Sequence, residues 1–358
     1  MTDHRSLLAR ATPPDDDPVL PTLAAVAHRH DAPVAERLAD LHRWLADDLG
    51  DLEAALGAIG PADADRAWTA ARHLLDRPGK RIRPLAVILA ARLGGRGLDP
   101  AVRGAAIAAE LAHAATLLHD DVIDDGAERR GAPTARVVYG NAASVLGGDH
   151  LLLTALRRLD GDPRLTASLI DTLARMVRAE ALQLERRRRF EPDRALYLDI
   201  VEGKTAVLFA WALTAGGHLA GLDDPAITTL HRAGRALGMT FQLVDDLLDI
   251  AGDPALTGKD ACADVREGKL TWPLLIASER DPNIALRLRT LAAASVEPAP
   301  QDAAALTRAV QSTGALDETR REAERHAAEA HRHLAALPAG RARRGLETLV
   351  DAALSRQT

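Results

Sequence analysis

The chain has 358 residues, of which 47% are hydrophobic and 27% are charged, so it is too apolar to be a disordered chain. Aromatic residues make up only 3%, and abundant Ala, Leu and Arg favour helices over a β-sandwich or barrel. The 45 basic and 51 acidic residues give a net charge of −6, so no overall positive field attracts nucleic acid or acidic lipid. Any anionic ligand must be bound by local basic clusters.

The cysteine content and the apolar segments bear on the cellular compartment. The single cysteine, Cys262, can form neither an intrachain disulfide nor a thiolate metal site, which favours a reducing cytoplasm. The charged residues near the start precede an apolar stretch of only residues 7–9, too short for a secretory signal. Residues 205–222 carry no formal charge, but Gly216 and Gly217 interrupt them, and we interpret them as a core helix rather than a membrane span.

In chain order, residues 1–33 contain repeated prolines and aspartates and are predicted to form a flexible leader, so the catalytic domain is expected to span 34–358. Three aspartate–proline pairs then predict long helices, because aspartate caps a helix and proline suits its first turn. These helices are expected to start at Pro100, Pro163 and Pro225 and to end near Asp125, Arg189 and Ile250. Shorter helices are expected at 34–57, 63–76, 84–93, 142–159, 194–219, 271–279, 301–313, 315–336 and 341–355.

The lack of strand-like segments and the short connections between helices predict the fold class and the number of domains. No six-residue segment alternates as a strand does, so the sequence predicts an all-α protein. Interruptions such as 94–95 and 298–300 are too short to be domain linkers, which favours a single domain. The polar segment 252–269 is longer than an ordinary connection and is predicted to be a lid or binding loop.

Two copies of the pattern DDxxD end two of the long helices. They consist of Asp120, Asp121 and Asp124, and of Asp245, Asp246 and Asp249. The first and fifth positions share a helix face, so each copy places two carboxylates together at a cost of about 0.2–0.5 kcal/mol. Oxygen ligands without His or Cys suit Mg²⁺, which bridges carboxylates to phosphate. A solvated acidic helix end is the alternative, but two copies that each follow an apolar helix favour a metal site.

Basic residues lie close to the acidic motifs and to helix starts: Lys80, Arg83, Arg129, Arg130, Lys204, Lys259 and Lys269. Lys80 and Arg83 precede a helix N-terminus, where anions are favoured. Singly, each of these cations is typical of a solvated surface. Together they surround both acidic motifs with positive charge, as a cluster of carboxylates, Mg²⁺ and a diphosphate requires.

Short motifs accompany these charges along the whole domain: GKRIRP at 79–84, LAH at 111–113, LLH at 117–119, RRG at 129–131, GNAAS at 140–144, KTA at 204–206, FQLV at 241–244, GKLTWP at 268–273 and TGAL at 313–316. From about Val34 to Arg356 the chain therefore resembles the trans-isoprenyl diphosphate synthases of the polyprenyl synthetase family. The similarity is closest to its medium- and long-chain members. It implies a helical bundle of the isoprenoid-synthase type around a central active-site cavity.

The resemblance also implies roles for individual residues. The positions that match the isopentenyl diphosphate site are Lys80, Arg83, His113 and Arg130. Those that match the allylic diphosphate site are Arg129, Lys204, Thr205, Gln242, Lys259 and Lys269. Asp120, Asp124, Asp245 and Asp249 match Mg²⁺ ligands, with three ions expected around a bound diphosphate, and Asp121, Asp246 and Lys204 complete the catalytic set. Without the family, His113 and Gln242 would be interpreted as ordinary polar side chains.

The implied reaction is a Mg²⁺-dependent prenyl transfer. Departure of diphosphate from the allylic substrate leaves a carbocation, which the double bond of isopentenyl diphosphate attacks head to tail. The cation formed by this attack then loses a proton to the released diphosphate, which restores a double bond. The resemblance also implies a homodimer. The cysteine content predicts a cytoplasmic location, and the net charge predicts no nucleic-acid partner. A non-catalytic partner subunit and a class I terpene cyclase are the alternatives. Both intact acidic motifs count against the subunit, and the second DDxxD counts against the cyclase.

The product length is predicted from residues one to two turns before the first motif. Ala112, Ala115 and Thr116 are small, which favours a medium- or long-chain product, with geranylgeranyl diphosphate as the alternative. Small residues here are also typical of close helix packing.

Two departures from the family pattern stand out. Pro78 replaces a usual glycine before Lys80 and stiffens that loop. The four arginines at 186–189 are interpreted as a solvated helix end, with a weak contact to anionic membranes as the alternative.

Overall fold

The computed structural model describes residues 32–61, 63–77, 79–129, 131–251, 263–293 and 300–356. The predicted leader lies outside these residues except for positions 32 and 33, as do Pro78, Arg130, Lys259 and Cys262. Of the predicted lid at 252–269, the described part begins with the short helix Ala263–Arg266 instead of an open loop.

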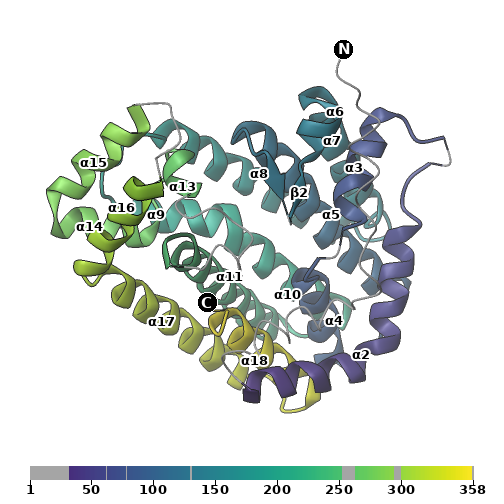
Figure 1. Cartoon of the computed structure of the whole chain (residues 1–358). Helices are drawn as coiled ribbons and strands as arrows, with labels where there is room; N and C mark the ends of the chain where they lie inside the picture. Colours follow the sequence, from purple (N-terminus) through teal and green to yellow (C-terminus); the bar gives the residue numbers. More distant parts are fainter. Residues whose placement is uncertain are drawn as a thin grey trace.

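The described residues are almost entirely helical, which confirms the all-α prediction (Figure 1). The helices are α2 Ala32–Gly57, α3 Arg66–Leu75, α4 Ile82–Leu93, α5 Pro100–Ile123, α6 Ala135–Tyr139, α7 Asn141–Arg157, α8 Pro163–Arg186, α9 Arg194–Val201, α10 Val207–Leu219, α11 Asp224–Ala251, α13 Ala263–Arg266, α14 Trp272–Arg280, α15 Pro282–Ala293, α16 Pro300–Ser312, α17 Ala315–Ala335 and α18 Arg341–Leu354. A π-helical turn, η2, covers Glu202–Ala206, and β1 Glu128–Arg129 pairs antiparallel with β2 Ala132–Pro133.

Helix α10 lies at the centre of the bundle, where it packs against α4, α5, α8 and α11 (Figure 1). Its first seven side chains, 207–213, are all buried. Gly216 approaches α4 so closely that a Cβ atom there would lie 2.2 Å from the backbone oxygen of Val87. The prediction that the uncharged segment is a core helix is therefore confirmed.

Helix α5 is the second central helix, and it packs against α4, α7 and α10. Among the described residues it alone is long and apolar enough to cross a membrane, and 72% of its most apolar window is buried inside the bundle. Helix α11 packs between α10 and α17. The two helices that carry the acidic motifs thus both flank α10.

The predicted starts of the three long helices agree with the structure to within one residue, whereas the helices expected to start at 34, 63 and 84 start at 32, 66 and 82. Asp99 accepts hydrogen bonds from the N–H groups of Ala101 and Val102, and Asp162 caps α8 in the same way. Helix α11, however, begins at Asp224, and its first turn is capped by Asp223.

Several elements differ from the predictions. The helix expected at 194–219 is divided into α9, η2 and α10, because a π turn inserts an extra residue that a 3.6-residue pattern does not reveal. The short helices α6, α13 and α15 and the strand pair were not predicted. Helix α8 ends at Arg186 and not near Arg189, because Arg188 and Phe190 adopt left-handed backbone conformations with φ of 64° and 48°.

Candidate active site

The first acidic motif lies at the C-terminal end of α5. Asp121 is only 2% exposed and accepts a hydrogen bond from Arg129 at 2.7 Å. Asp124 ends the helix, and Lys269 Nζ lies 2.7 Å from its carboxylate. The carboxylate of Asp120 lies 3.8 Å from Lys204 Nζ. Each aspartate of the motif therefore faces a different cation.

The π turn η2 presents Lys204 and Thr205 to this end of the bundle. Its first residue, Glu202, is held by Arg235 at 2.7 Å and by Arg175 at 3.2 Å. These ion pairs, with burial opposing them, lower the pKa of Glu202. A π turn inside a helix is frequent at functional sites, and here Arg175 and Arg235 hold its first residue.

Three polar side chains of neighbouring helices position the η2 residues. Lys204 Nζ donates to Gln183 Oε1 at 2.9 Å and forms an ion pair with Glu180 of α8. Thr205 Oγ1 donates to Gln242 Oε1 at 2.9 Å. Lys204 and Thr205 are thereby connected to α8 and α11.

The second acidic motif lies near the C-terminal end of α11. Asp245 forms an ion pair with Arg356 at 2.5 Å, and the Arg356 guanidinium lies 4.1 Å from the centre of the Phe241 ring. Asp249 is buried at 5% exposure and lies close to the backbone N–H of Asp264, at 3.5 Å. The end of the described chain therefore folds back onto this motif.

Asp246 is the most deeply buried carboxylate of the second motif. It accepts hydrogen bonds from Tyr197 Oη at 2.5 Å, from Gln242 Nε2 at 2.9 Å and from the Trp272 N–H at 2.9 Å. Burial, together with the nearby Asp264 carboxylate, raises the pKa of Asp246 to about 7. These three donors connect α9, α11 and α14 through one side chain.

One cavity brings several predicted site residues together. It measures about 80 Å³ and is lined by Lys204, Thr205, Gln242, Asp246 and Lys269, among others. Burial by itself would lower the pKa of Lys269. The nearby carboxylates of Glu267 and Asp264 have the larger combined effect, so the pKa is raised overall and the amine stays charged. The cavity is thus lined by charges of both signs.

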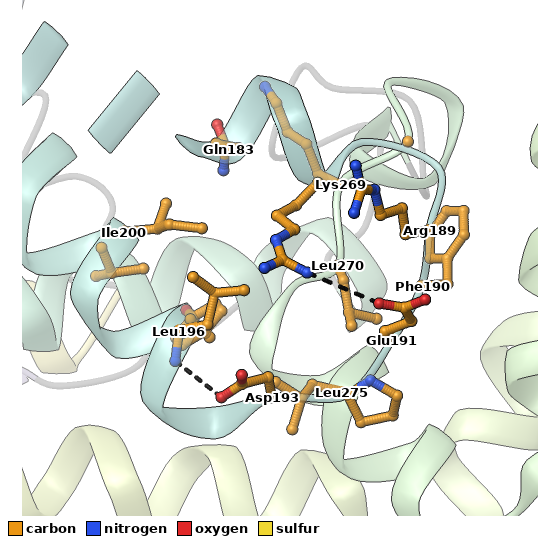
Figure 2. A pocket seen from close by; sticks show the side chains of 15 residues that line it. Gln183, Arg189, Phe190, Glu191, Asp193, Leu196, Ile200, Lys269, Leu270 and Leu275 are labelled. Atoms are coloured by element: carbon orange, nitrogen blue, oxygen red, sulfur yellow. Dashed lines mark hydrogen bonds and ion pairs between the residues drawn. The ribbon is translucent and has the colours of Figure 1, made fainter. Parts of the chain in front are cut away.

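A larger cavity of about 210 Å³ adjoins the first and shares Gln183, Tyr197 and Lys269 with it. Figure 2 shows Arg189 and Lys269 on one side and the apolar side chains of Leu196 and Ile200 on the other. This second cavity was not predicted from the sequence.

Three of the residues predicted to bind isopentenyl diphosphate lie at or near α4 and α5: Lys80 just before α4, Arg83 in α4 and His113 in α5. The fourth, Arg130, lies outside the described residues. Arg83 is buried, and its guanidinium lies 4.5 Å from the centre of the Phe209 ring. Burial lowers the pKa of Arg83 to about 10, although Glu110 and Asp245 favour its charged form. Lys80 and His113 are both partly exposed.

The arginine run at 186–189 is not simply a solvated helix end, so that interpretation was wrong for its second member. Arg187 is turned inward: it forms an ion pair with Asp124 and donates to the backbone oxygen of Ile123 at 3.0 Å. Sequence reasoning also missed Arg356, Tyr197 and Gln183, none of which belongs to a quoted motif.

The carboxylates of the two motifs have the oxygen donors that Mg²⁺ prefers. Within the described ranges no three His, Cys, Asp or Glu side chains converge on one point as ion ligands. Instead, Asp120, Asp124 and Asp245 lie against lysine and arginine side chains. The metal-ligand assignments, including Asp249, therefore stay predictions that the donor chemistry supports.

The three residues predicted to set product length lie on the buried part of α5. Ala112 and Ala115 have no exposed surface, and the Thr116 hydroxyl donates to the backbone oxygen of His113 at 2.8 Å. None of the three lines either of the cavities described above. Their role stays a prediction.

Comparisons with known proteins agree with this geometry. The sequence profile of the polyprenyl synthetase family matches residues 66–310. The chain is 35% identical over 310 residues to the heptaprenyl diphosphate synthase component 2 of Geobacillus stearothermophilus, covering 86% of this chain and 95% of the relative. It is 36% identical over 285 residues to the nonaprenyl diphosphate synthase of Mycobacterium tuberculosis, covering 79% and 85%. A polyprenyl synthase from Caulobacter crescentus, solved with calcium and isoprenyl diphosphate, superposes with a TM-score of 0.84 at 36% identity, covering 89% of this chain and 97% of that one.

The fold and the site together define an all-α prenyltransferase. Its two acidic helix ends, with lysines between them, are what a transferase of diphosphate substrates requires. The chain belongs to the polyprenyl synthetase family, which confirms the resemblance found in its sequence.

Proposed function

We propose that this chain condenses isopentenyl diphosphate with an allylic diphosphate, head to tail, to give an all-trans polyprenyl diphosphate. Lys204 and Lys269 carry the proposal, because they come from distant parts of the sequence, line one cavity and reach Asp120 and Asp124. Lysines positioned in this way stabilise the negative charge that develops on a departing diphosphate.

The two diphosphates are assigned to different sides of the site. The allylic diphosphate is assigned to Arg129, Lys204, Thr205, Gln242, Lys259 and Lys269. Isopentenyl diphosphate is assigned to Lys80, Arg83, His113 and Arg130. Arg83 supports the second assignment, because a buried arginine stacked on Phe209 is held rigidly for a bidentate contact.

Mg²⁺ is the proposed cofactor, with three ions around the bound diphosphate held through Asp120, Asp124, Asp245 and Asp249. When bound, Mg²⁺ neutralises charge on the leaving group. Among the chain's own residues, Gln242 donates to Asp246 and accepts from Thr205, so the two fix the orientation of its amide. The apolar wall with Leu196 and Ile200 excludes water that would otherwise quench a carbocation.

A medium- or long-chain product is proposed. The small side chains Ala112 and Ala115 on α5 support it. The two relatives described above, named as heptaprenyl and nonaprenyl diphosphate synthases, support it further.

A homodimer is proposed from an exposed apolar face on α7 and α8. Leu146 and Leu153 of α7 are 54% and 58% exposed, and Ile170, Val177 and Leu184 of α8 are 49–70% exposed. On each helix these residues are seven positions apart, so they form a stripe of the kind that packs against another helix. A two-fold pair would bury both stripes.

A cytoplasmic location and a catalytic domain of 34–358 behind a leader complete the proposal. Arg187 forms an ion pair with Asp124, so any contact with an anionic membrane is assigned to Arg186, Arg188 and Arg189.

The test is to incubate the purified full chain with farnesyl and isopentenyl diphosphates and Mg²⁺, and to size the products by reversed-phase chromatography. Polyprenyl diphosphates of about six to ten units are expected, whereas a twenty-carbon product would support the geranylgeranyl alternative. Binding of farnesyl diphosphate without turnover would instead identify a non-catalytic subunit. No binding would contradict the proposal.

A further inference from the structure

The arginine at position 187 has a contact that no family motif accounts for. It follows the last residue of α8, yet its side chain is only 16% exposed, and it pairs with Asp124 at the end of α5. It also donates to the backbone oxygen of Ile123 at 3.0 Å. The guanidinium therefore binds both the last carboxylate of the first acidic motif and an end carbonyl of the same helix.

The backbone around Arg187 is constrained in a way that favours this contact. Arg188 and Phe190 both have positive φ angles, a conformation that costs non-glycine residues on the order of 1–2 kcal/mol. Phe190 is 1% exposed and packs in the hydrophobic core beside α11 and α14. Strained backbone persists only where its surroundings enforce it, so the turn is a built feature of the fold.

The same turn is joined to the segment that carries Lys269. The Arg188 N–H donates to the backbone oxygen of Gly268 at 2.8 Å. Gly268 has a φ of 75°, and a Cβ atom there would lie 2.6 Å from the side chain of Arg188. Arg187 and Lys269, the two cations at Asp124, are therefore held by one backbone junction.

We propose that Arg187 is a positioning residue that holds Asp124 in the metal-free enzyme and so lowers the affinity of the first acidic motif for a divalent cation until a diphosphate is bound. The inference rests on the proposed function, because it requires the first motif to bind metal. A carboxylate that is already paired with two cations binds a metal ion only if the ion displaces one of them or overcomes their repulsion. A diphosphate offers the guanidinium another anion, so metal and diphosphate binding become coupled.

Arg187→Gln tests this through metal binding and not through turnover. Because the substitution removes a positive charge that opposes the metal ion, we expect Mn²⁺ to bind the variant about tenfold more tightly than the wild type in the absence of substrate, as measured by electron paramagnetic resonance. In the presence of farnesyl thiodiphosphate, an unreactive allylic diphosphate, the gain should disappear. A merely structural loss would weaken metal binding, so the sign of the change distinguishes the two roles.

Arg186→Gln is the matched control, because it removes the same charge at the neighbouring position. The Arg186 side chain is half exposed, and within the described residues its ion pair is with Glu191, at 3.8 Å. It should leave Mn²⁺ affinity unchanged. Arg187→Lys keeps the charge, so its Mn²⁺ affinity should be close to that of the wild type. This variant keeps the proposal testable if the glutamine variant misfolds.

The outcomes separate the two proposals. Equal or weaker Mn²⁺ binding by Arg187→Gln, with a wild type that binds both metal and farnesyl thiodiphosphate, would overturn the role of Arg187 alone. A wild type that binds neither would overturn the proposed function as well.

Discussion

Replacing Lys269 by Met perturbs the proposed leaving-group site most directly. Its ammonium lies 2.7 Å from Asp124 and 2.6 Å from Glu267, and it lines both cavities. Methionine keeps most of the apolar stem but removes one positive charge from the cluster. Among the described residues, Arg187 is then the remaining cation that pairs with Asp124. With one positive charge fewer, the variant cluster attracts a diphosphate less strongly than the wild type does.

The magnitude follows from the role of a single preorganised donor. Loss of one such group in an active site reduces kcat by about 10²–10³-fold, that is by about 3–4 kcal/mol of transition-state stabilisation. We expect Lys269→Met to reach this range in single-turnover assays with farnesyl and isopentenyl diphosphates, with a smaller effect for Lys269→Arg. Glu267→Gln is the control, because it removes a partner of the lysine without removing the cation. Turnover of Lys269→Met within about fivefold of the wild type would refute the reasoning.

Four further predictions concern the metal sites, the assembly, the product and the pH dependence of stability. Asp120→Asn and Asp245→Asn should each lower turnover by about 10²-fold or more with unchanged circular dichroism, because neither carboxylate belongs to the apolar core. Light scattering should give a mass of about 76 kDa, twice 38.1 kDa, and Leu153→Glu with Val177→Glu should give monomers; a wild-type monomer at micromolar concentration would exclude the dimer. Ala115→Phe should shorten the products at a cost of about 1–3 kcal/mol in stability, and an unchanged product distribution would show that the chain does not pass this face of α5. The hydrogen bond to Asp351 raises the pKa of His331, so its stabilisation is present below pH 6.5 and is lost as the pH rises through the native pKa; urea unfolding of His331→Gln should therefore differ from the wild type at pH 5.5 and converge with it at pH 8.5.

The parts of the fold that were predictable are those specified by local physics. The caps at Asp99 and Asp162 satisfy backbone donors within three residues of the chain, so the starts of α5 and α8 can be identified from sequence. The π turn at Glu202–Ala206 depends instead on ion pairs of Glu202 with Arg175 and Arg235, which lie 27 and 33 positions away. Such distant partners leave no periodic signal.

The residues of the candidate site likewise fall into those that the sequence could predict and those that depend on tertiary packing. Lys204, Gln242 and Lys269 could be proposed because each lies in a motif that the family shares, and the structure places all three around one cavity. Tyr197 and Trp272 hold Asp246 through contacts that only the packing of α9 and α14 against α11 creates. A sequence shows that Asp246 is acidic but not that its pKa is raised by burial.

The arginine run shows most clearly why charge patterns underdetermine a site. Four consecutive arginines after an amphipathic helix are indistinguishable in sequence, and the dipole of α8 favours cations at its end whatever they contact. In the structure the arginines differ because of the backbone. The turn at Arg188 and the burial of Phe190 orient Arg187 toward Asp124, whereas Arg186 stays half exposed. The turn at Arg188 is held by a backbone hydrogen bond to Gly268, 80 residues further along the chain. Tertiary packing, and not the composition of the run, therefore decides which of the four arginines contacts the acidic motif.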